Sequence, residues 1–452
     1  MKCQLEFGDE RLRLTLPDSA AILTLPDVAP LARPAAAILQ ALDSPMAAPA
    51  LREVIRAKRE KKPDATAVVV VSDNTRPVPY RGEQGVLAPI LAQLRASGVK
   101  EVTVLVATGT HRGLSDDELR RLLPPEAFSP GITVVNHDCR DASSLRAIGR
   151  TRRGTEVAVN RRYLDADIRI LTGLVEPHFM AGVSGGPKSI CPGLIGERAT
   201  YVFHGAPMMA HERASSLVME GNPCQDESRE VARMAESDFV VNVTISRDKR
   251  LTGVFAGELQ AVHRAATAKV MKDSVIRIRG EYDVVVTHAG FVGINHYQAA
   301  KAAVEACRAL ATGGSLILAA NNTDHDPVGS ANYRRLLPFL TELGPDGFDR
   351  KVCSSDWAFV PDQWEVQMWG RAVRKVGPAG RLVYCAPQLT GAAFTGLPGV
   401  DGGAGIAGLQ GRDLAEAMVQ RAIDHACQTR FHARVAVLAD GPYGVPCLTP
   451  GE

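Results

Sequence analysis

Residues 66–71 have the sequence Thr-Ala-Val-Val-Val-Val, a short apolar run rich in β-branched residues that predicts a buried β-strand. An amphipathic stretch at residues 85–97, closed by Gly98, predicts a helix, and residues 101–107 predict the next strand. Strand-like and helix-like segments keep alternating in this way as far as residue 439. Because this alternation is typical of parallel sheets built from right-handed strand–helix–strand units, we predict an α/β fold.

The alternation comes in two runs, which predicts two domains, each with a largely parallel sheet flanked by helices. The chain has 452 residues, and at about 150 residues per domain this length suffices for two or three domains. A charged helix predicted at residues 259–272 separates the two runs, so we place the boundary near residue 275. The predicted domains are therefore residues 1–275 and residues 276–452. The last strand, residues 434–439, is a candidate to return to the N-terminal domain.

The composition disfavours several classes of protein. With 52 basic and 50 acidic side chains the net charge is 52 − 50 = +2, and 45% hydrophobic with 23% charged residues is typical of globular proteins rather than strongly basic nucleic-acid binders. No apolar run approaches the roughly 20 residues that span a bilayer, and the N-terminal residues resemble neither a secretory signal nor a transit peptide. Nine cysteines without a C-x-x-C pair favour a reducing compartment and no structural zinc. We therefore expect a cytoplasmic protein that binds neither nucleic acid nor a membrane.

Two polar segments directly follow predicted strands, and in open α/β sheets ligands bind at the carboxyl ends of the strands. The first is Ser-Asp-Asn-Thr-Arg-Pro at residues 72–77. A turn capped by Asp73 with a solvated Arg76 explains it, and the functional alternative is a guanidinium that binds a carboxylate or phosphate at two points. The second is Thr-Gly-Thr-His-Arg-Gly at residues 108–113, where His111 is either structural or a group that moves protons.

A glycine-rich segment at residues 176–193 partly matches a phosphate-binding P-loop, because Gly182, Lys188 and Ser189 have the required spacing. Pro187 breaks the match, since proline removes the free N–H and the backbone freedom that the motif needs before its lysine. The segment therefore disfavours a P-loop ATPase. It predicts a lysine presented by a glycine-rich loop, either as a nucleophile or as a phosphate ligand.

Two further patterns are incomplete. His204 and His211 are seven residues apart, and imidazole suits nickel, copper, zinc or iron, but a tightly held metal would need additional ligands from elsewhere. Residues 403–408 satisfy the dinucleotide-binding pattern G-x-G-x-x-G. The residues before them, 397–402, predict a loop rather than a strand, so we expect a flexible glycine loop there and no dinucleotide site.

Polar residues also open two predicted helices, Asn-His-Tyr-Gln-Ala-Ala-Lys at residues 295–301 and Asp-Gln-Trp-Glu-Val-Gln at residues 362–367. Gln298 and Lys301 are three residues apart and therefore share a helix face. Taken singly, a solvated helix surface explains each segment.

Taken together, these segments resemble the nickel-dependent lactate racemase family, in the expected order and over almost the whole chain. The match rests on Ser-Asp-Asn-Thr-Arg-Pro (72–77), Gly-Thr-His-Arg (109–112), Pro-His (177–178), Ser-Gly-Gly-x-Lys-Ser-Ile (184–190), His204, Tyr-Gln-x-x-Lys (297–301) and Asp-Gln-Trp-x-x-Gln (362–367). The resemblance implies an isomerase, a racemase or epimerase that interconverts the enantiomers of a 2-hydroxy acid. It implies reversible hydride transfer to a nickel-pincer nucleotide (nickel pyridinium-3,5-bisthiocarboxylic acid mononucleotide), bound by the N-terminal domain, with the active site in the cleft between the domains.

The resemblance also assigns roles to residues of this chain. Lys188 would anchor the cofactor covalently, and His204 would bind the nickel, whose other donors in a planar site come with the cofactor. His111 and His178 would be the paired acid/base groups. The implied substrate-binding residues are Arg76, Tyr297, Gln298, Lys301 and Trp364. Those implied to contact the cofactor beside Lys188 are Asp73, Thr75, Ser184, Gly185 and Gly186.

Two alternatives to a lactate racemase stay open. The first is an epimerase for malate, an aromatic hydroxy acid or a sugar acid, because we expect family variation at residues 293–296, before Tyr297. The second is a pincer-nucleotide binding protein without turnover, which the retention of both His111 and His178 disfavours. The expected partners are the small 2-hydroxy acid and, transiently, proteins of cofactor biosynthesis. The sequence makes no prediction about the oligomeric state.

Overall fold

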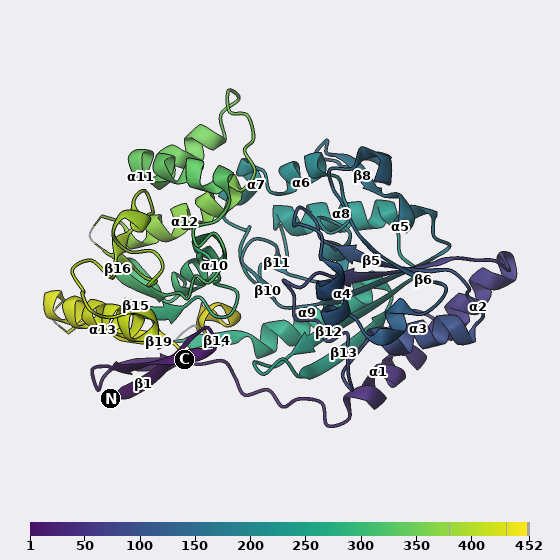
Figure 1. Ribbon diagram of the computed structural model, residues 1–452, viewed down its shortest axis with the longest axis horizontal. Coiled ribbons are helices and arrows are strands. Elements are labelled where there is room, and N and C mark those ends of the chain that lie inside the picture. Colours follow the sequence, from purple (N-terminus) through teal and green to yellow (C-terminus); the bar gives the residue numbers. More distant parts are fainter. Residues whose placement is uncertain (379, 431, 450–452) are drawn as a thin grey trace. The chain divides into compact units, whose positions relative to one another are not determined.

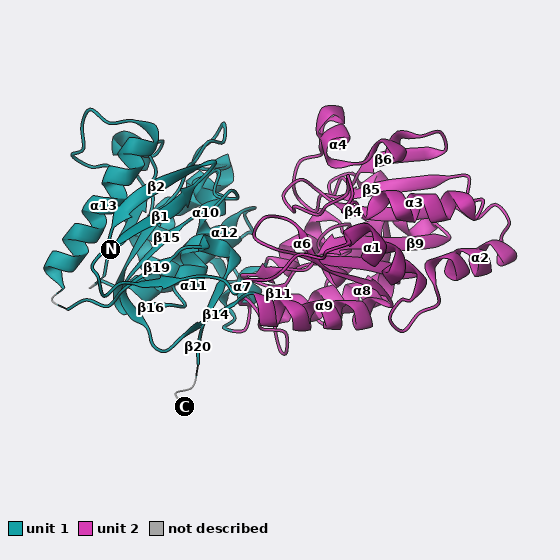
Figure 2. Cartoon of the chain, turned by 90° about the horizontal axis from the view of Figure 1, so that it is seen from below, with its two compact units in different colours: residues 1–26, 205–212, 274–452 teal, residues 27–204, 213–273 magenta. Residues whose placement is uncertain are grey.

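The computed structural model describes residues 1–378, 380–430 and 432–449, and it divides the chain into two compact units (Figure 2). Unit 1 comprises Met1–Pro26, Gly205–Glu212 and Ser274–Glu452, and unit 2 comprises Asp27–His204 and Arg213–Asp273. No helix in these described ranges is long and apolar enough to cross a membrane.

The core of unit 2 is a six-stranded sheet in the order β13-β12-β9-β4-β5-β6, of which β5, β6, β12 and β13 are labelled in Figure 1. Its strands are β4 (Ala67–Ser72), β5 (Val102–Ala107), β6 (Ile132–Asn136), β9 (Ile168–Leu174), β12 (Phe239–Ile245) and β13 (Leu251–Gly257). All neighbours pair in parallel except β12 and β13, which are antiparallel. Four consecutive valines of β4, Val68 to Val71, have no exposed surface, as expected for a central strand covered on both faces.

Helices and short hairpins surround this sheet. The helices of unit 2 are α1 (Pro34–Asp43), α2 (Leu51–Lys61), α3 (Leu87–Ala96), α4 (Asp116–Leu122), α5 (Arg161–Asp165), α6 (Glu197–Phe203), α8 (Pro223–Ala235) and α9 (Leu259–Asp273), with the 3-10 turns η1 (Pro125–Phe128), η2 (Ala142–Ser144) and η3 (Gly186–Ser189). The hairpins are β7 (Leu145–Arg150) with β8 (Glu156–Asn160), and β10 (Pro177–His178) with β11 (Gly182–Val183). α4 begins with a capping box: Ser115 Oγ accepts from the Glu118 amide at 3.3 Å, and the Glu118 carboxylate accepts from the Ser115 amide at 2.8 Å.

Unit 1 holds a second six-stranded sheet, in which every pair of neighbours is parallel. Its order is β18 (Val400–Asp401), β17 (Leu382–Cys385), β16 (Leu310–Ala319), β15 (Tyr282–His288), β19 (Val435–Leu438) and β3 (Ala21–Leu23). Beside it lie α7 (Ala206–Ala210), α10 (His296–Ala306), α11 (Ala331–Val352), α12 (Gln363–Val376), α13 (Gly411–Thr429), η4 (Gly391–Phe394), η5 (Gly441–Tyr443) and the parallel pair β14 (Val275–Ile278) with β20 (Val445–Leu448). The predicted α/β class with largely parallel, helix-flanked sheets is confirmed.

The boundary predicted near residue 275 adjoins the junction of Asp273 and Ser274, but residues 1–26 belong to unit 1 rather than to the unit that follows them in sequence. Their first part is a hairpin of β1 (Lys2–Phe7) and β2 (Glu10–Thr15). The side chains of Leu5, Leu12 and Leu14 are buried in one apolar cluster with residues of α13. This burial explains why the hairpin lies with the C-terminal sheet.

The glycine pattern at residues 403–408 forms turns, as predicted, but one detail of the prediction is wrong. Two residues before it pair with β17 as the short strand β18, because Val400 continues the edge of the sheet. The next helix, α13, begins only at Gly411, so the segment lacks the strand–turn–helix connection of a dinucleotide site.

We expect Leu12→Ala to destabilise unit 1, because it removes a fully buried side chain from the cluster at α13. Changes of this kind cost about 2–5 kcal/mol. All three tryptophans of the chain lie in unit 1, so tryptophan fluorescence during urea unfolding reports on this unit. The control is Leu39→Ala, at a side chain that is 49% exposed on α1. An unchanged fluorescence midpoint for Leu12→Ala would contradict the place of the hairpin in unit 1.

Candidate active site

The polar segments after β4 and β5 meet because these two strands are neighbours in the sheet. Asp73 is 4% exposed, and its Oδ2 lies 2.6 Å from Nδ1 of His111. Its Oδ1 accepts from the amide of Thr75 at 3.1 Å and from the Thr75 hydroxyl at 2.5 Å. Asp73 therefore caps a turn, as in the simpler interpretation of this segment, and at the same time binds the imidazole of His111.

The electrostatics of this pair fix the tautomer of the neutral ring. Burial alone would raise the pKa of Asp73, but the hydrogen bonds with His111 and Thr75 hold it below its ordinary value. An ionised carboxylate only accepts hydrogen bonds, so Nδ1 of His111 carries a proton. In the neutral form of the ring the other nitrogen, Nε2, has the lone pair, on a side chain that is 53% exposed. This is the arrangement of a general base held in one tautomer by a carboxylate.

His178 is held differently. It ends β10, is 8% exposed, and its Nδ1 lies 3.3 Å from the amide nitrogens of both Met180 and Ala181 in the β10–β11 hairpin. Because backbone amides only donate, Nδ1 is the acceptor, and the neutral ring carries its proton on Nε2. The two predicted acid/base histidines thus present opposite functions at Nε2: an acceptor at His111 and a donor at His178.

Arg76, predicted to bind a carboxylate, forms an ion pair with Glu176. Both side chains are partly exposed, at 28% and 30%. The sequence analysis assigned no role to Glu176. Its position just after β9 and two residues before His178 could have indicated one, because ligands bind at the carboxyl ends of parallel strands. The guanidinium of Arg76 is therefore already oriented by one carboxylate of the protein.

Two positions of the glycine-rich loop have room only for glycine. A Cβ on Gly185 (φ +69°) would lie 2.7 Å from Val175 Cγ2, and one on Gly186 (φ +49°) 2.5 Å from His263 Cδ2. The loop is tied down by a bond of 2.9 Å from the Gly186 amide to Asn242 Oδ1. The hydroxyl of Ser184, predicted to contact the cofactor, donates to the Leu174 carbonyl at 2.7 Å.

This loop leads into η3 and presents Lys188, whose Nζ lies 4.8 Å from the centre of the Phe203 ring. His204 follows Phe203 at the end of α6, and its ring meets the same Phe203 ring edge-on at 4.9 Å. Burial lowers the pKa of His204 to about 3, and the nearby Lys188 and His111 side chains act in the same direction. The neutral imidazole that a metal requires is therefore favoured there.

These residues fit the implied cofactor. Within the described part of the chain, no three His, Cys, Asp or Glu side chains group together as a metal site. A metal bound by His204 would consequently need donors from a bound organic group, which the lysine beside the same phenylalanine ring is suited to anchor. His211, the alternative ligand, is exposed and lies in unit 1 after α7.

Unit 1 carries the remaining predicted residues on two helices, α10 and α12. Trp364 Nε1 donates to the hydroxyl of Tyr297 at 2.8 Å, and the indole stacks on Phe359 with the ring centres 6.1 Å apart. Gln298 and Lys301 follow Tyr297 on α10, which Asn295 caps through a bond of 2.9 Å to the Gln298 amide. Tyr297 and Trp364 thus form one hydrogen-bonded aromatic surface.

His296, the residue before Tyr297, lies in the core of unit 1. His296 has no exposed surface, hydrogen-bonds Tyr333 at 2.8 Å and stacks on Trp369 with the ring centres 4.3 Å apart. Burial lowers its pKa to about 3. His296 is therefore a neutral core residue of unit 1.

The predicted residues are thus divided between the two units. The group in unit 2 consists of Asp73, Thr75, Arg76, His111, His178, Ser184, Gly185, Gly186, Lys188 and His204. The group in unit 1 consists of Tyr297, Gln298, Lys301 and Trp364.

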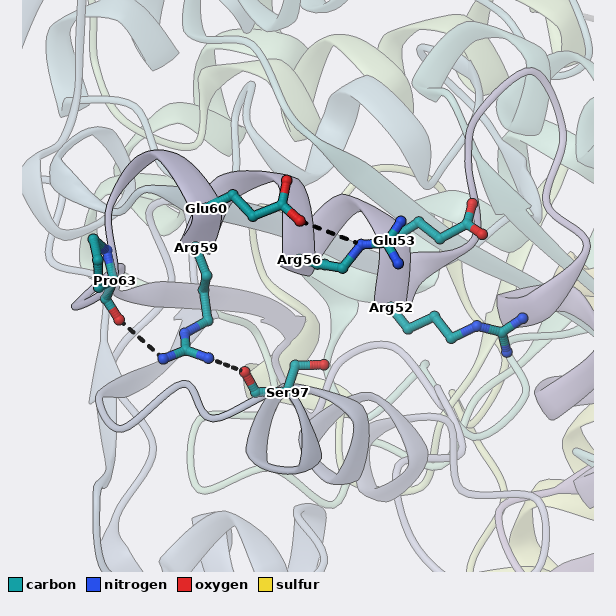
Figure 3. Close-up of a pocket in the computed structure, with 7 residues that line it drawn as sticks. All are labelled: Arg52, Glu53, Arg56, Arg59, Glu60, Pro63 and Ser97. Atoms are coloured by element: carbon teal, nitrogen blue, oxygen red, sulfur yellow. Dashed lines mark hydrogen bonds and ion pairs between the residues drawn. The ribbon is translucent and has the colours of Figure 1, made fainter.

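A separate hollow of about 460 Å³ beside α2 has no predicted site residue in its wall (Figure 3). It is lined by Arg52, Glu53, Arg56, Arg59, Glu60, Pro63 and Ser97. Arg59 donates to the carbonyls of Pro63 and Ser97, and Arg56 pairs with Glu60 at 3.6 Å. Arg56 and Arg59 thus interact with other groups of the protein, and we assign no function to the hollow.

Comparison with known proteins gives a consistent result. Residues 7–216 match the lactate racemase N-terminal domain family. Proteins named lactate racemase from Thermoanaerobacterium thermosaccharolyticum and Lactiplantibacillus plantarum are each 28% identical to the chain, over 336 and 335 residues. Each alignment covers 74% of this chain and 76% of the relative.

Two solved structures have the same fold. The lactate racemase apoprotein from Thermoanaerobacterium thermosaccharolyticum superposes with a TM-score of 0.81 and 23% identity, covering all of both chains. A protein from Thermotoga maritima superposes with a TM-score of 0.60 and 16% identity over 88% of this chain and 98% of its own. The resemblance indicated by the sequence motifs is confirmed, since the chain is similar to lactate racemases in sequence and in fold.

Proposed function

We propose that this protein is an isomerase that interconverts the enantiomers of a 2-hydroxy acid, with lactate as the first candidate. The observation that carries the proposal is the bond of 2.6 Å between buried Asp73 and His111. It leaves Nε2 of His111 as a base at the carboxyl end of the sheet, where parallel sheets bind ligands. The 28% identity to two proteins named lactate racemase supports the substrate class.

Inversion of a 2-hydroxy acid requires the hydroxyl proton to leave while the hydrogen on the α-carbon is transferred. In the proposed reaction Nε2 of His111 takes the hydroxyl proton of one enantiomer. The opposite enantiomer forms when the imidazolium form of His178 gives its Nε2 proton to the oxygen of the keto intermediate, and proton exchange with water returns both histidines to their neutral forms. In the reverse direction Nε2 of His178 takes the hydroxyl proton of this enantiomer and must therefore be unprotonated. The neutral ring then carries its proton on Nδ1 and gives up the two long contacts with the amides of Met180 and Ala181. Arg76 and Lys301 are the proposed partners of the substrate carboxylate.

The proposal includes the nickel-pincer nucleotide as cofactor. Lys188 would hold it covalently, His204 would bind its nickel, and the loop with Ser184, Gly185 and Gly186 would lie against it. When bound, the cofactor supplies reversible acceptance of the α-hydrogen as hydride. Because Asp73 and Thr75 are engaged with each other and with His111, we assign them to orienting the base.

In unit 1, Tyr297, Gln298 and Trp364 are the proposed neighbours of the substrate. The hydrogen bond of 2.8 Å between Trp364 and Tyr297 fixes both rings. A rigid aromatic wall restricts the substrate side chain, whereas the carboxylate contacts are common to all 2-hydroxy acids. A panel of lactate, malate, aromatic hydroxy acids and sugar acids, followed by chiral chromatography, therefore identifies the substrate. Absence of interconversion with every acid by cofactor-loaded protein would contradict the proposal.

We expect Asp73→Asn to lower racemisation by about 10² to 10⁴, the usual worth of a general base. The asparagine amide can donate to Nδ1, which places the proton of His111 on Nε2 and removes the base. Initial rates with both enantiomers measure the effect, and Asp117→Asn, at an exposed position on α4, is the control. Full activity of Asp73→Asn would show that the carboxylate does not set the tautomer.

We expect the intact mass of protein made in cofactor-producing cells to exceed the chain mass by one nucleotide, and Lys188→Ala to abolish this increment. His204→Ala should keep the increment but lose nickel, since the imidazole binds the metal and not the organic group. Mass spectrometry and nickel analysis of the purified proteins give both readouts. A fully active protein with unmodified Lys188 would refute the covalent anchor, and retained nickel in His204→Ala would move the assignment to His211.

We expect His111→Ala and His178→Ala each to slow racemisation by about 10² to 10⁴. Both directions must slow equally, because the equilibrium constant between enantiomers is one. In a rapid-quench single turnover, each variant should form 2-keto acid from only one enantiomer, and the two variants should differ in which one. Keto acid formed equally from both enantiomers in both variants would be incompatible with opposed histidines.

A further inference from the structure

Glu176 is an acidic residue of the candidate site that the proposed reaction does not use. It follows β9, and Arg76 follows the neighbouring parallel strand β4, so both lie at the carboxyl end of the sheet. Nη1 of Arg76 donates to Oε1 of Glu176, and the two side chains are 28% and 30% exposed. Ion pairs with this much exposure contribute little to folding, so the contribution of this pair to stability is small.

The backbone of Glu176 is fixed by Ser184, at the base of the β10–β11 hairpin. The Ser184 amide donates to the Glu176 carbonyl at 2.9 Å, and the Glu176 amide donates to Ser184 Oγ at 3.1 Å. His178 lies two residues further along the same hairpin. The Glu176 carboxylate therefore extends from a backbone that is hydrogen-bonded on both sides and that also carries one of the two histidines.

Arg76 belongs to the turn that holds the other histidine. Its amide donates to the Asp73 carbonyl at 3.3 Å, and Asp73 Oδ2 lies 2.6 Å from Nδ1 of His111. A continuous series of contacts thus runs from His111 to the ion pair, and from there along the chain to His178. In this series the ion pair joins the turn after β4 to the segment after β9.

The ion pair leaves part of the guanidinium open to a ligand. A guanidinium has five N–H donors in one plane, and Glu176 accepts from Nη1. Among the residues that the structure describes, none accepts a hydrogen bond from Nε or Nη2 of Arg76. These two nitrogens form one edge of the group, and such an edge matches both oxygens of a carboxylate. Glu176 therefore does not occupy the edge at which a substrate carboxylate would bind.

We propose that Glu176 is a positioning residue, which holds the Arg76 guanidinium so that its Nε and Nη2 edge binds the carboxylate of the substrate. The inference rests on the proposed function in that Arg76 binds this carboxylate. A mobile arginine loses rotamer freedom when it binds a ligand, and an arginine that is already held loses less. The same ion pair fixes the carboxylate-binding group relative to the loops of His111 and His178, and so places the α-carbon between the two bases.

The alternative role for Glu176 is that of a competitor, because its carboxylate and that of the substrate approach the same guanidinium. The two roles differ in the sign of their effect. Removal of a positioning residue weakens the binding of a carboxylate, whereas removal of a competitor strengthens it. The contact at Nη1 favours positioning, since a competitor would occupy the edge formed by Nε and Nη2.

The test is the binding of oxamate, an unreactive carboxylate analogue of a 2-keto acid, to the full chain as purified from cofactor-producing cells. Calorimetry measures tight binding, and ligand-observed NMR measures weak binding. Glu176→Ala should weaken binding by about tenfold, the upper range of the cost of ordering one long side chain. Glu176→Gln should weaken it less, because the amide oxygen can still accept from Nη1.

A double-mutant cycle shows whether Glu176 acts through Arg76. Arg76→Met should weaken oxamate binding more than Glu176→Ala does, because it removes the group that binds the carboxylate. Adding Glu176→Ala to Arg76→Met should then have no further effect. A merely structural role of Glu176 would weaken binding in both backgrounds.

The matched control for Glu176→Gln is Glu281→Gln in unit 1. Glu281 forms an ion pair of 2.7 Å with Lys375, and their side chains are 36% and 26% exposed, close to the values for the pair of Arg76 and Glu176. Glu281 directly precedes β15, at the amino end of its sheet and so at the end opposite to ligand sites. This variant should bind oxamate as the wild type does.

Unchanged or tighter oxamate binding by Glu176→Ala overturns the inference, as does a further loss of affinity when this change is added to Arg76→Met. Absence of binding by the wild type also overturns it, because Arg76 would then not bind a carboxylate. Racemisation by the same proteins separates the two claims. Turnover by the wild type with unchanged binding in Glu176→Ala refutes only the role of Glu176, and Glu176-dependent binding without turnover refutes only the proposed reaction.

Discussion

The parallel pairing of β4 with β5 is the constraint on which the candidate site depends. It brings Asp73 and His111, which are 38 residues apart in the sequence, to a separation of 2.6 Å. Because side chains that follow neighbouring parallel strands emerge at the same edge of a sheet, no long-range loop is needed to assemble this pair. The turn that Asp73 caps with Thr75 then holds the carboxylate in place, so one residue serves both local structure and the orientation of a base.

The position of Lys188 depends on a loop whose backbone packs closely against neighbouring residues. Gly185 and Gly186 leave no room for a Cβ, and the path they allow carries Lys188 to the same phenylalanine ring that His204 meets. The positive charge of the lysine and the burial of the imidazole act in the same direction, since both favour the neutral ring. The proposed metal ligand and the proposed attachment point thus lie against the same ring.

Much of this arrangement was predictable from the sequence. β-branched runs predicted the central strands, because strand propensity is largely a local effect. The polar segments after β4 and β5 indicated the sheet edge at which Asp73 and His111 meet. Which residues pair across it was not predictable: the ion pair of Arg76 with Glu176 joins residues 100 apart and depends on how two loops close. The tautomer of His178 depends on a hairpin of a few residues that has no pattern of its own.

The largest differences between the sequence-based predictions and the structure come from tertiary packing. Leu12 and Leu14 alternate with charged residues, which is a strand signal, but nothing in the alternation says that this hairpin packs on α13, about 400 residues later. His296 is a second example. A histidine that opens a helix is expected at the polar surface, but His296 stacks on Trp369 and is buried in the core.

The central claim is that the hydrogen on the α-carbon moves as hydride while the histidines handle only the hydroxyl proton. The most direct test follows the fate of a deuterium at C2 of (S)- and (R)-lactate, or of the acid that the substrate panel identifies, during racemisation in ordinary water. The account predicts that the product of opposite hand keeps its deuterium in both directions. Loss of the label to solvent at the rate of racemisation would contradict it, because a histidine would then remove the α-hydrogen as a proton.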